Sequence, residues 1–422
     1  MTRRDRLAAT ALALVLALGL EAVRGHADWG PSEGVYVLTS RLLLHGGDLY
    51  GELVGSQPPW TYLFGAAALA LHDSLDAMRL ACGLLQVLAG VLAAEAVWRL
   101  TGERRAAIAA AGIVVVTPWA VHEHGLLLPE QLGVPLLVGA ALLASRPATA
   151  RGAGVLAGVA VFVKLPFVLP MALVLAASPA RGAAIRSAVA AVAAQAVAFT
   201  ALFGTGLWTQ IVVAQSQAAG GGLEFQIGAW VQAGWNLAPL LLFAAAAIRW
   251  RDRAPEPALV RTFAAAAVGA LALTATIVKP GTGLNVVVPS EPLLVVLAAA
   301  GVVWLLGTPL RSRAALVAGA LGLLLLAESA SLLLDPENPR PFHRPASSSP
   351  GWKVSHSRAE MQRLVAAAER CPPDQAYTGP ALVAFLADRR VPADQPDYFI
   401  VSRAATHAAA LARRQADLPG CP

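Results

Sequence analysis

The composition of this 422-residue chain excludes a soluble globular protein. Hydrophobic residues make up 57% of the chain and charged residues only 14%, whereas soluble proteins carry about 25% charged residues. The formal net charge of +6 does not indicate nucleic-acid binding, because the basic residues fall in small groups between apolar runs and form no stripe interleaved with aromatic residues.

Apolar runs of the length that crosses a bilayer recur along most of the chain. A span needs about 20 mostly apolar residues, because the hydrocarbon core is about 30 Å thick. Lipid offers the backbone no hydrogen-bond partner, so the spans must be helical. The sequence therefore predicts an all-α polytopic membrane protein with about eleven transmembrane helices, near residues 7–23, 76–99, 106–121, 126–144, 153–163, 166–178, 187–206, 236–249, 262–278, 289–307 and 314–334.

The first apolar run also has the features of a secretory signal peptide. Basic MTRRDR precedes LAATALALVLALGL, and small residues follow at 25–27. Because further spans follow along the chain, we expect an uncleaved signal-anchor, and cleavage is the alternative.

Arginine placement predicts the orientation, because cytoplasmic loops carry an excess of Lys and Arg. A cytoplasmic N-terminus puts most arginines near span ends on the cytoplasmic face and leaves few basic residues opposite. Arg151 and Arg181 then bracket a pair of short helices broken at Lys164-Leu165-Pro166, so the chain crosses twice between them. We expect a multi-pass protein of the cell inner (plasma) membrane with an extracytoplasmic C-terminus.

Two long segments lie outside in this topology, the first outer loop at 24–75 and the region at 335–422. The second segment opens with a proline-rich linker. Its later part carries helical patterns and short β-rich pieces, at 358–370, 380–389 and 403–416 and at 375–378 and 397–401 respectively.

This pattern predicts a small C-terminal α/β extracytoplasmic domain at 335–422, after a transmembrane domain at 1–334. Cys371 and Cys421 flank its polar part in an oxidising compartment. A disulfide between them and two free thiols are both open. Cys82 lies inside an apolar run and is expected to be a packed thiol.

The first outer loop concentrates acidic residues beside apolar sequence. Apolar residues recur at helical spacing over 33–45, which predicts an amphipathic helix lying on the membrane. Pro58-Pro59 opens a second helix at 58–72. Glu33 falls at the start of the first helix, where the helix dipole stabilises a carboxylate, so capping and chemistry are both open for Glu33. Asp28 is the other candidate.

The segment HEHGLLLPEQ at 122–131 lies outside as well. His122 and His124 are two residues apart, but no third ligand follows at a fixed spacing, so we expect a solvated turn rather than a metal site. Glu130 follows Pro129 in a run that enters the membrane. An ionisable group there is a functional candidate by default.

Lys164 and Lys279 both lie where a span meets the outer face. Such side chains often snorkel to the interface; alternatively, an ammonium at this depth would meet a lipid phosphate. Asn285 belongs to the glycine-containing turn KPGTGLNVVVPSEP at 279–292. The chain carries no GxxxxGK[ST] or strand–helix GxGxxG motif, which excludes the common nucleotide-binding loops.

The stretch SEGVYVLTSRLLLHGGDLYGEL, followed by SQPPWTYLFGAAAL, resembles the first outer loop of GT-C superfamily glycosyltransferases. Within this superfamily, the stretch is most similar to the branch related to protein O-mannosyltransferases and lipid A aminoarabinose transferases. The resemblance covers about residues 1–335 and continues through the basic turn at 101–105, LPEQLGVPLLVGAALLA, GVAVFVKLPFVLPMALVL and GLNVVVPSEPLLVVLAAAG. The C-terminal YTGPALVAFLADRRVP is similar to the small outer domain of some members.

The resemblance implies a hexosyl- or pentosyltransferase that moves a sugar, with inversion, from a polyprenyl-phosphate-linked donor. The acceptor would be a glycan, a lipid or a protein on the extracytoplasmic face, in contact with membrane lipids. One carboxylate suffices as general base, and a cation suffices for the phosphate leaving group. No cofactor is expected, and a divalent cation is not indicated.

The residues that match the family pattern receive the following expected roles. Glu33 and Asp28 are the catalytic candidates. Lys164, Lys279 and Arg41 are expected to bind the donor phosphate, and the substrate is expected to contact Gln57, Glu130 and Asn285. Two departures stand out: the family's acidic pair reads Ser32-Glu33 here, and its Lys-Pro-Pro element reads Gln57-Pro58-Pro59.

Two other functions remain open. The Ser32 departure would fit a catalytically inactive relative that serves as a subunit or scaffold. A lipid-linked glycan transporter or flippase is the third candidate, and it would require ionisable residues buried in mid-span, of which the sequence shows few.

Overall fold

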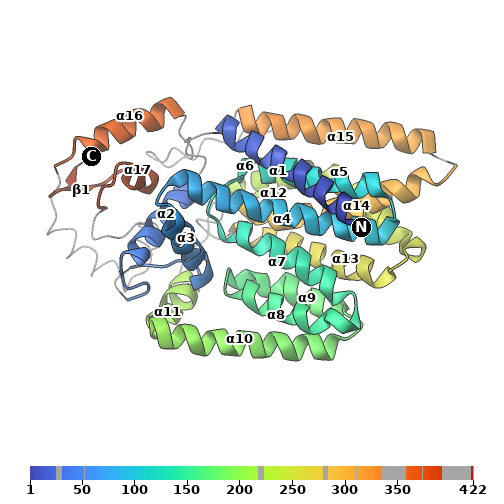
Figure 1. Cartoon of the computed structure of the whole chain (residues 1–422), viewed down its shortest axis with the longest axis horizontal. Coiled ribbons are helices and arrows are strands. Elements are labelled where there is room, and N and C mark those ends of the chain that lie inside the picture. The colour runs from blue at the N-terminus through green and yellow to red at the C-terminus, as the bar shows by residue number, and fades with distance from the viewer. Residues whose placement is uncertain are drawn as a thin grey trace.

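The computed structural model describes residues 1–24, 31–51, 53–216, 223–278, 284–309, 311–334, 358–372, 374–391 and 420–421. Most of these residues are helical, and the longer helices run side by side in one bundle (Figure 1). Helices α2 and α3 and the C-terminal elements gather at one end of the bundle, and the N-terminus lies at the other end. We call these the α2/α3 end and the N-terminal end.

The helices follow the apolar runs of the sequence closely. In the first half of the chain they are α1 (Arg3–Arg24), α2 (Pro31–Leu44), α3 (Pro59–Leu71), α4 (Leu75–Thr101), α5 (Arg104–Val116), α6 (Pro118–His122), α7 (Pro129–Ala144), α8 (Ala150–Val161), η2 (Leu165–Phe167), α9 (Val168–Ala177) and α10 (Arg181–Phe203). In the second half they are α11 (Gly206–Trp208), the π-helix η3 (Thr209–Ala214), α12 (Leu223–Arg249), α13 (Pro257–Ala272), η5 (Leu273–Val278), η6 (Leu284–Ser290), α14 (Glu291–Leu306) and α15 (Arg311–Leu334).

Proline explains two of the differences from the predicted boundaries, whereas α10 and α12 begin 6 and 13 residues earlier than predicted without a proline at their starts. The run predicted as one helix at 106–121 is split into α5 and α6, because Pro118 has no amide hydrogen to continue α5 and instead occupies the first turn of α6. Pro129 likewise starts α7 three residues later than predicted. The predicted break at Lys164 is confirmed, since α8 ends at Val161 and a 3₁₀ turn precedes α9.

Five of the described helices are long and apolar enough to cross a membrane: Arg3–Val23, Leu75–Thr101, Arg181–Phe203, Pro257–Thr276 and Arg311–Ser331. Five more are apolar but shorter: Pro59–Leu71, Pro129–Ala144, Leu165–Ala177, Ala233–Arg249 and Ser290–Leu306. These helices agree with a polytopic membrane protein. The number of spans remains the prediction made from the sequence.

Small residues let neighbouring helices approach closely. A Cβ atom at Gly154 of α8 would lie 2.2 Å from the Ala184 carbonyl oxygen of α10, and one at Gly301 of α14 would lie 2.1 Å from the Phe243 carbonyl oxygen of α12. Lipid gives helices no hydrophobic reason to associate, so such close backbone packing is what holds a bundle together in a membrane.

Ion pairs tie helix ends together at the N-terminal end. Arg99 of α4 donates to Glu256 Oε1 at 3.1 Å, and Arg146, after α7, also pairs with Glu256. Partial burial raises the pKa of the Glu256 carboxyl, but the hydrogen bonds from Arg99 and Arg146 outweigh it and lower the pKa to about 2. The carboxylate before α13 is thus fixed to α4 and α7.

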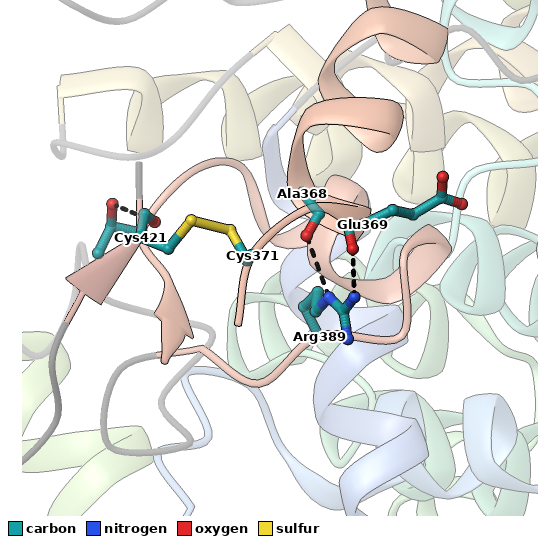
Figure 2. Close-up of a disulfide and its surroundings, with 6 residues drawn as sticks. Ala368, Glu369, Cys371, Arg389 and Cys421 are labelled. Atoms are coloured by element: carbon teal, nitrogen blue, oxygen red, sulfur yellow. Dashed lines mark hydrogen bonds between the residues drawn. A yellow bond between two sulfur atoms is a disulfide. The ribbon is translucent and has the colours of Figure 1, made fainter. Parts of the chain in front are cut away.

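The described C-terminal residues (358–372, 374–391 and 420–421) form what we call the C-terminal segment. It contains α16 (Arg358–Glu369), β1 (Ala376–Tyr377), α17 (Ala381–Leu386) and β2 (Gly420–Cys421), with β1 and β2 parallel. A disulfide joins Cys371 to Cys421, so this open possibility is confirmed (Figure 2). Cys82 is a free, buried thiol as predicted. The helix and strand predicted at 403–416 and 397–401 lie outside the described residues.

Loss of the disulfide should loosen the C-terminal segment. The two cysteines are 50 residues apart, and closing a loop of that length contributes about 4 kcal/mol in the chain-entropy account. We expect Cys371→Ser to speed tryptic cleavage within 358–391 in the full-length protein, as followed by mass spectrometry. Cys82→Ala, which keeps the disulfide, should be cleaved at the wild-type rate. Equal rates for all three proteins would contradict this prediction.

Candidate functional site

Buried polar side chains gather at the α2/α3 end of the bundle. They come from the first turns of α2, α7 and α14, from α4, from the end of α6 and the stretch after it, and from the stretch between α8 and α9. The buried ones include Glu33, Arg79, Gln86, His122, Glu123, His124, Glu130, Gln131 and Glu291. Burying so many polar groups beside apolar helices is costly unless they are partnered, and ionisable residues at such depth are functional candidates.

Glu33 forms a two-pronged ion pair with Arg79. Arg79 Nε lies 2.8 Å from Glu33 Oε1 and Arg79 Nη2 lies 2.6 Å from Glu33 Oε2. The side chains are 0% and 1% exposed, so the pair joins the first turn of α2 to the second turn of α4 away from water. Both Glu33 oxygens are taken by the arginine, which makes this carboxylate a poor acceptor for another proton.

The segment predicted as a solvated turn is buried, and that prediction is wrong. His122, Glu123 and His124 are all less than 10% exposed. His122 Nδ1 lies 2.8 Å from Glu123 Oε1, and His124 Nδ1 contacts Gln86 Oε1 of α4. The turn is buried because the apolar residues that follow it, Leu126–Leu128, also pack in the core and pull it inward.

Glu291 is a buried carboxylate that caps a neighbouring helix. Its oxygens accept hydrogen bonds from Thr117 Oγ1 at 2.7 Å and from the backbone amides of Trp119 and Ala120 at 3.0 and 2.9 Å. These amides belong to the first turn of α6, where they have no partner within the helix. Glu291 therefore holds α14 against α6 and is a structural anchor.

Three of the predicted substrate-contacting and phosphate-binding residues lie together. Lys164 Nζ contacts Glu130 Oε1, and Asn285 Nδ2 donates to the same oxygen at 2.9 Å. Glu130 is 1% exposed, and its second oxygen, Oε2, has no hydrogen-bond partner among the described residues. The Lys164 side chain is 17% exposed, so it is less deeply buried than Glu130.

A small cavity lies against this cluster. Its lining combines the charged pair with apolar side chains and one hydroxyl: Glu130, Lys164, Pro166, Phe167, Leu273, Thr276, Val286 and Pro289. A carboxylate oxygen without a donor beside such a cavity is an acceptor site for a hydroxyl or an ammonium group.

The start of α3 packs beside Lys164. The Trp60 amide donates to the Phe162 carbonyl at 3.4 Å, and Thr61 Oγ1 donates to the Val163 carbonyl at 3.4 Å. The Pro58-Pro59 element thus lies next to the lysine, although the position before it is Gln57. Gln57 is held through its backbone: its carbonyl accepts from Tyr50 Oη at 2.5 Å.

The loop before Pro58 is pinned from the other side by the π-helix. Gln210 of η3 accepts from the Gly55 amide at 2.7 Å and donates to the Tyr50 carbonyl at 2.8 Å. Tyr50 itself has φ 68°, a left-handed conformation that is strained for an aromatic residue. Strain of this kind is kept only where surrounding contacts fix the backbone.

An apolar groove of about 380 Å³ runs between α3, α4, α7 and α8. Its walls are Trp60, Phe64, Leu85, Leu88, Leu92, Leu132, Pro135, Leu136, Gly139, Leu142, Leu143, Leu156, Val159 and Val163. From Leu132 to Leu143 it follows α7 for about 16 Å at the helical rise, roughly half the hydrocarbon thickness. Its Trp60–Val163 end adjoins Lys164.

The remaining predicted site residues are placed differently or lie outside the described residues. Arg41 contacts the C-terminal segment and Asp73, with Arg41 Nε 2.9 Å from Asp73 Oδ1. Asp28 and Lys279 lie outside the described residues. Within the part of the chain that the structure describes, no three His, Cys, Asp or Glu side chains are grouped to hold a metal ion.

Sequence reasoning missed Arg79, Glu291 and Gln210 as site-forming residues. Arg79 had counted only as one of the few basic residues on the outer face, although an arginine one turn inside an apolar run needs a buried partner. Glu291 satisfies the same rule that singled out Glu130, an acidic residue beside proline in a run entering the membrane. Nothing in the local sequence marks Gln210.

Removing one partner of the Glu33–Arg79 pair should destabilise the protein strongly. Arg79→Met leaves a buried carboxylate without its cation, at a cost of about 3–5 kcal/mol. We expect a large drop in thermal stability in detergent, most of it restored by adding Glu33→Leu. Arg6→Met, which breaks the exposed Arg6–Glu95 pair, should change little. A double variant as unstable as Arg79→Met would contradict the ion-pair account.

No protein-family model matches this sequence, and no curated protein matches it. Solved structures do match its fold. ArnT from Cupriavidus metallidurans in the apo state matches with a TM-score of 0.64 at 17% identity, over 98% of this chain and 88% of ArnT. The same protein bound to undecaprenyl phosphate matches with a TM-score of 0.62 at 16% identity, over the same shares of the two chains.

The oligosaccharyltransferase of Archaeoglobus fulgidus in its apo form matches less closely. Its TM-score is 0.51 at 14% identity, over 98% of this chain and 69% of the oligosaccharyltransferase. Both proteins are membrane glycosyltransferases with the GT-C fold. The resemblance predicted from the sequence is thus confirmed at the level of architecture: the chain is a membrane protein with the GT-C fold.

Proposed function

We propose that this protein is a membrane glycosyltransferase that uses a polyprenyl-phosphate-linked sugar at the α2/α3 end of the bundle. The observation that carries the proposal is the Lys164–Glu130–Asn285 cluster next to an apolar groove that Val163 helps to line, in a chain with the GT-C fold. One end of this arrangement suits a phosphate and the other suits a hydrocarbon chain.

The groove is the proposed seat of the donor's polyprenyl chain. Its lining is almost wholly apolar, and its length along α7 is close to the thickness of the hydrocarbon layer of one leaflet. The solved structure of ArnT with undecaprenyl phosphate supports a lipid phosphate as the ligand class. Membrane lipids would fill the same groove when the donor is absent.

Lys164 is the proposed cation for the donor phosphate. A phosphate is a weak base and leaves without a general acid, so one positioned ammonium is enough to stabilise its charge. Glu130 and Asn285 hold the lysine and its surroundings in place, and Glu130 Oε2 offers an acceptor for a substrate hydroxyl. Lys279 is proposed as a second cation from the sequence alone.

The two described carboxylates considered as the general base differ in how many of their oxygens are already bound. Glu33 is fully engaged by Arg79, so its role is to fix α2 beside α4. Asp28, five residues earlier, remains the proposed base from the sequence pattern, and Glu130 is a further candidate because its Oε2 has no hydrogen-bond partner among the described residues. The acceptor oxygen attacks the anomeric carbon from the face opposite the donor phosphate, which breaks the bond to the phosphate and inverts the configuration. The base takes the acceptor proton.

The proposal also includes which side of the membrane each end of the bundle faces. Arginine placement supports a cytoplasmic N-terminal end, and the Cys371–Cys421 disulfide supports an oxidising compartment at the α2/α3 end. We therefore propose an inner-membrane protein with eleven spans, a transmembrane domain at 1–334 and an extracytoplasmic C-terminal domain at 335–422. Gln57 and Asn285 would contact the substrate from this side.

An inactive, scaffolding relative is the second candidate, and one observation favours it. The carboxylate that stands where the family's acidic pair is expected, Glu33, is buried in an ion pair and preceded by Ser32. Such a protein would bind the lipid phosphate without transferring a sugar. Binding and transfer must therefore be measured separately.

The central test combines binding and transfer in reconstituted membranes. Lys164→Ala should weaken binding of undecaprenyl phosphate about tenfold or more, which corresponds to about 1.4 kcal/mol. Glu130→Gln should keep binding, since it removes a negative charge near the phosphate. Loss of a catalytic base should cut transfer from a labelled polyprenyl-phosphate sugar about 10²–10⁴-fold, and Asp28→Asn, Glu33→Gln and Glu130→Gln are compared for this effect.

Arg363→Ala, an exposed arginine of α16, is the matched control for Lys164→Ala. Wild-type binding by Lys164→Ala would remove the lysine from the site. Full transfer by all three carboxylate variants would remove the single-base mechanism, and binding without any transfer by the wild type would favour the scaffold.

Filling the groove should select against long donors. Gly139 lies on the groove wall, where a Cβ atom would be 3.1 Å from Leu156 Cδ1, so Gly139→Leu must place its side chain in the groove. We expect about tenfold weaker binding of undecaprenyl phosphate and little change for a two-isoprene analogue. Gly319→Leu, at a glycine with nothing within 4 Å, is the control. Equal losses for both lipid lengths would contradict the assignment.

A further inference from the structure

Helix α2 lies between the site and the C-terminal segment. Its first turn contributes Glu33, which points to Arg79 of α4. On α3, a Cβ atom at Gly65 would lie 2.2 Å from Ser40 Oγ, so α2 and α3 are in close contact. The next residue, Gly34, faces α17: a Cβ atom there would lie 2.2 Å from the backbone nitrogen of Leu382.

The sequence predicted an α2 that rests on the membrane, but the structure covers it with protein on two sides. Residues 36–40 are all buried. Gly34 and Arg41 are seven residues apart, two helical turns, so they share the face toward α17. The close approach at Gly34 brings α17 down onto this face, and Arg41 then holds it there.

Arg41 makes four contacts that link three separate parts of the chain. Its Nη1 donates to the Phe385 carbonyl at 2.9 Å, and its guanidinium carbon lies 3.7 Å from the centre of the Phe385 ring. Its Nε donates to Asp73 Oδ1 at 2.9 Å, and Nη1 lies 3.6 Å from Asp388 Oδ1. Asp73 belongs to the turn between α3 and α4.

The C-terminal segment, which Arg41 contacts, is itself cross-linked. The disulfide closes the chain from the end of α16 to β2, and β2 pairs with β1 just before α17. Arg389 donates from Nε to the Ala368 carbonyl at 3.0 Å and from Nη2 to the Glu369 carbonyl at 2.5 Å, which ties the turn after α17 to the end of α16 (Figure 2).

We propose that Arg41 is a positioning residue that couples the disulfide-closed C-terminal segment to α2, and through α2 to the buried Glu33–Arg79 pair. The proposal rests on the proposed transferase function for its kinetic consequence but not for its structural one. It replaces the expected role of Arg41 in binding the donor phosphate. Two aspartates, a carbonyl and an aromatic ring already surround the guanidinium, so a phosphate would have to displace them.

The structural test follows amide hydrogen exchange in peptides that cover α2. Arg41→Ala should increase exchange in 31–44 and in 381–386 together, because one contact protects both. Reducing the wild-type disulfide should raise exchange in the same two peptides. Arg363→Ala, on the exposed face of α16, should leave both unchanged. Exchange confined to 381–386 would overturn the coupling.

The kinetic test separates positioning from phosphate binding. A positioning role predicts that Arg41→Ala lowers kcat about tenfold or more, through displacement of the site, with KM for the donor within about twofold of wild type. Phe385→Leu should produce the same pattern, and the double variant should be no worse than Arg41→Ala alone. Arg41→Lys, which keeps the charge but loses the planar fork and the stacking, should not rescue kcat.

The opposite pattern would overturn the proposal. A phosphate-binding Arg41 would raise KM for the donor, would be rescued in part by Arg41→Lys, and would add fully to Phe385→Leu. If the wild type transfers no sugar at all, the transferase function fails on its own. The exchange result and the binding of undecaprenyl phosphate to Arg41→Ala, expected at wild-type strength, then still decide the role of Arg41.

Discussion

The burial of charge at one end of an otherwise apolar bundle is the constraint on which the rest of this structure depends. A buried ionisable group needs a partner, and three of the carboxylates find theirs on another part of the chain. Glu33 finds Arg79, Glu130 finds Lys164 and Asn285, and Glu291 finds the first turn of α6. The partners lie far apart in sequence, so these contacts fix how the helices assemble.

Most of these groups stand at helix starts, and this placement has a simple cause. Proline occupies the first turn of α2, α3, α6, α7 and α14, where its missing amide costs nothing. Each such helix begins abruptly, with backbone amides that point out of the bundle end. The same end therefore collects irregular backbone and carboxylates, which a membrane protein tolerates only where protein covers them.

The sequence located most of the helices and several residues of the candidate site, but not how those residues pair. Hydropathy located nearly every helix, since the bilayer imposes length and composition together. Lys164 and Glu130 were predicted from charge beside proline at a span end, and Asn285 from its glycine-containing turn; the structure brings the three into contact. Their pairing was not predictable, because it depends on how α7, α8 and η6 pack in three dimensions.

The predictions for the turn at 122–124 and for Arg41 differ from the structure for the same reason, namely packing between distant parts of the chain. The turn at 122–124 looked solvated because its residues are polar, yet its burial is decided by the apolar residues on either side and by Gln86 of α4. Arg41 looked available for a phosphate because its partners Phe385 and Asp388 are encoded more than 300 positions later. Local sequence carries no information about a contact that distant.

That separation has a consequence for the order of assembly. The Arg41–Phe385 contact spans 344 positions, and during synthesis α2 emerges long before α17 exists. Contacts of such high sequence separation form late, because the entropy of closing the loop between the two residues is lost before the contact stabilises the fold. Until residue 421 is made and its disulfide closes, α2 has only its inner neighbours. The end of the bundle that holds the buried charges is therefore sealed last, after the whole membrane domain has been translated.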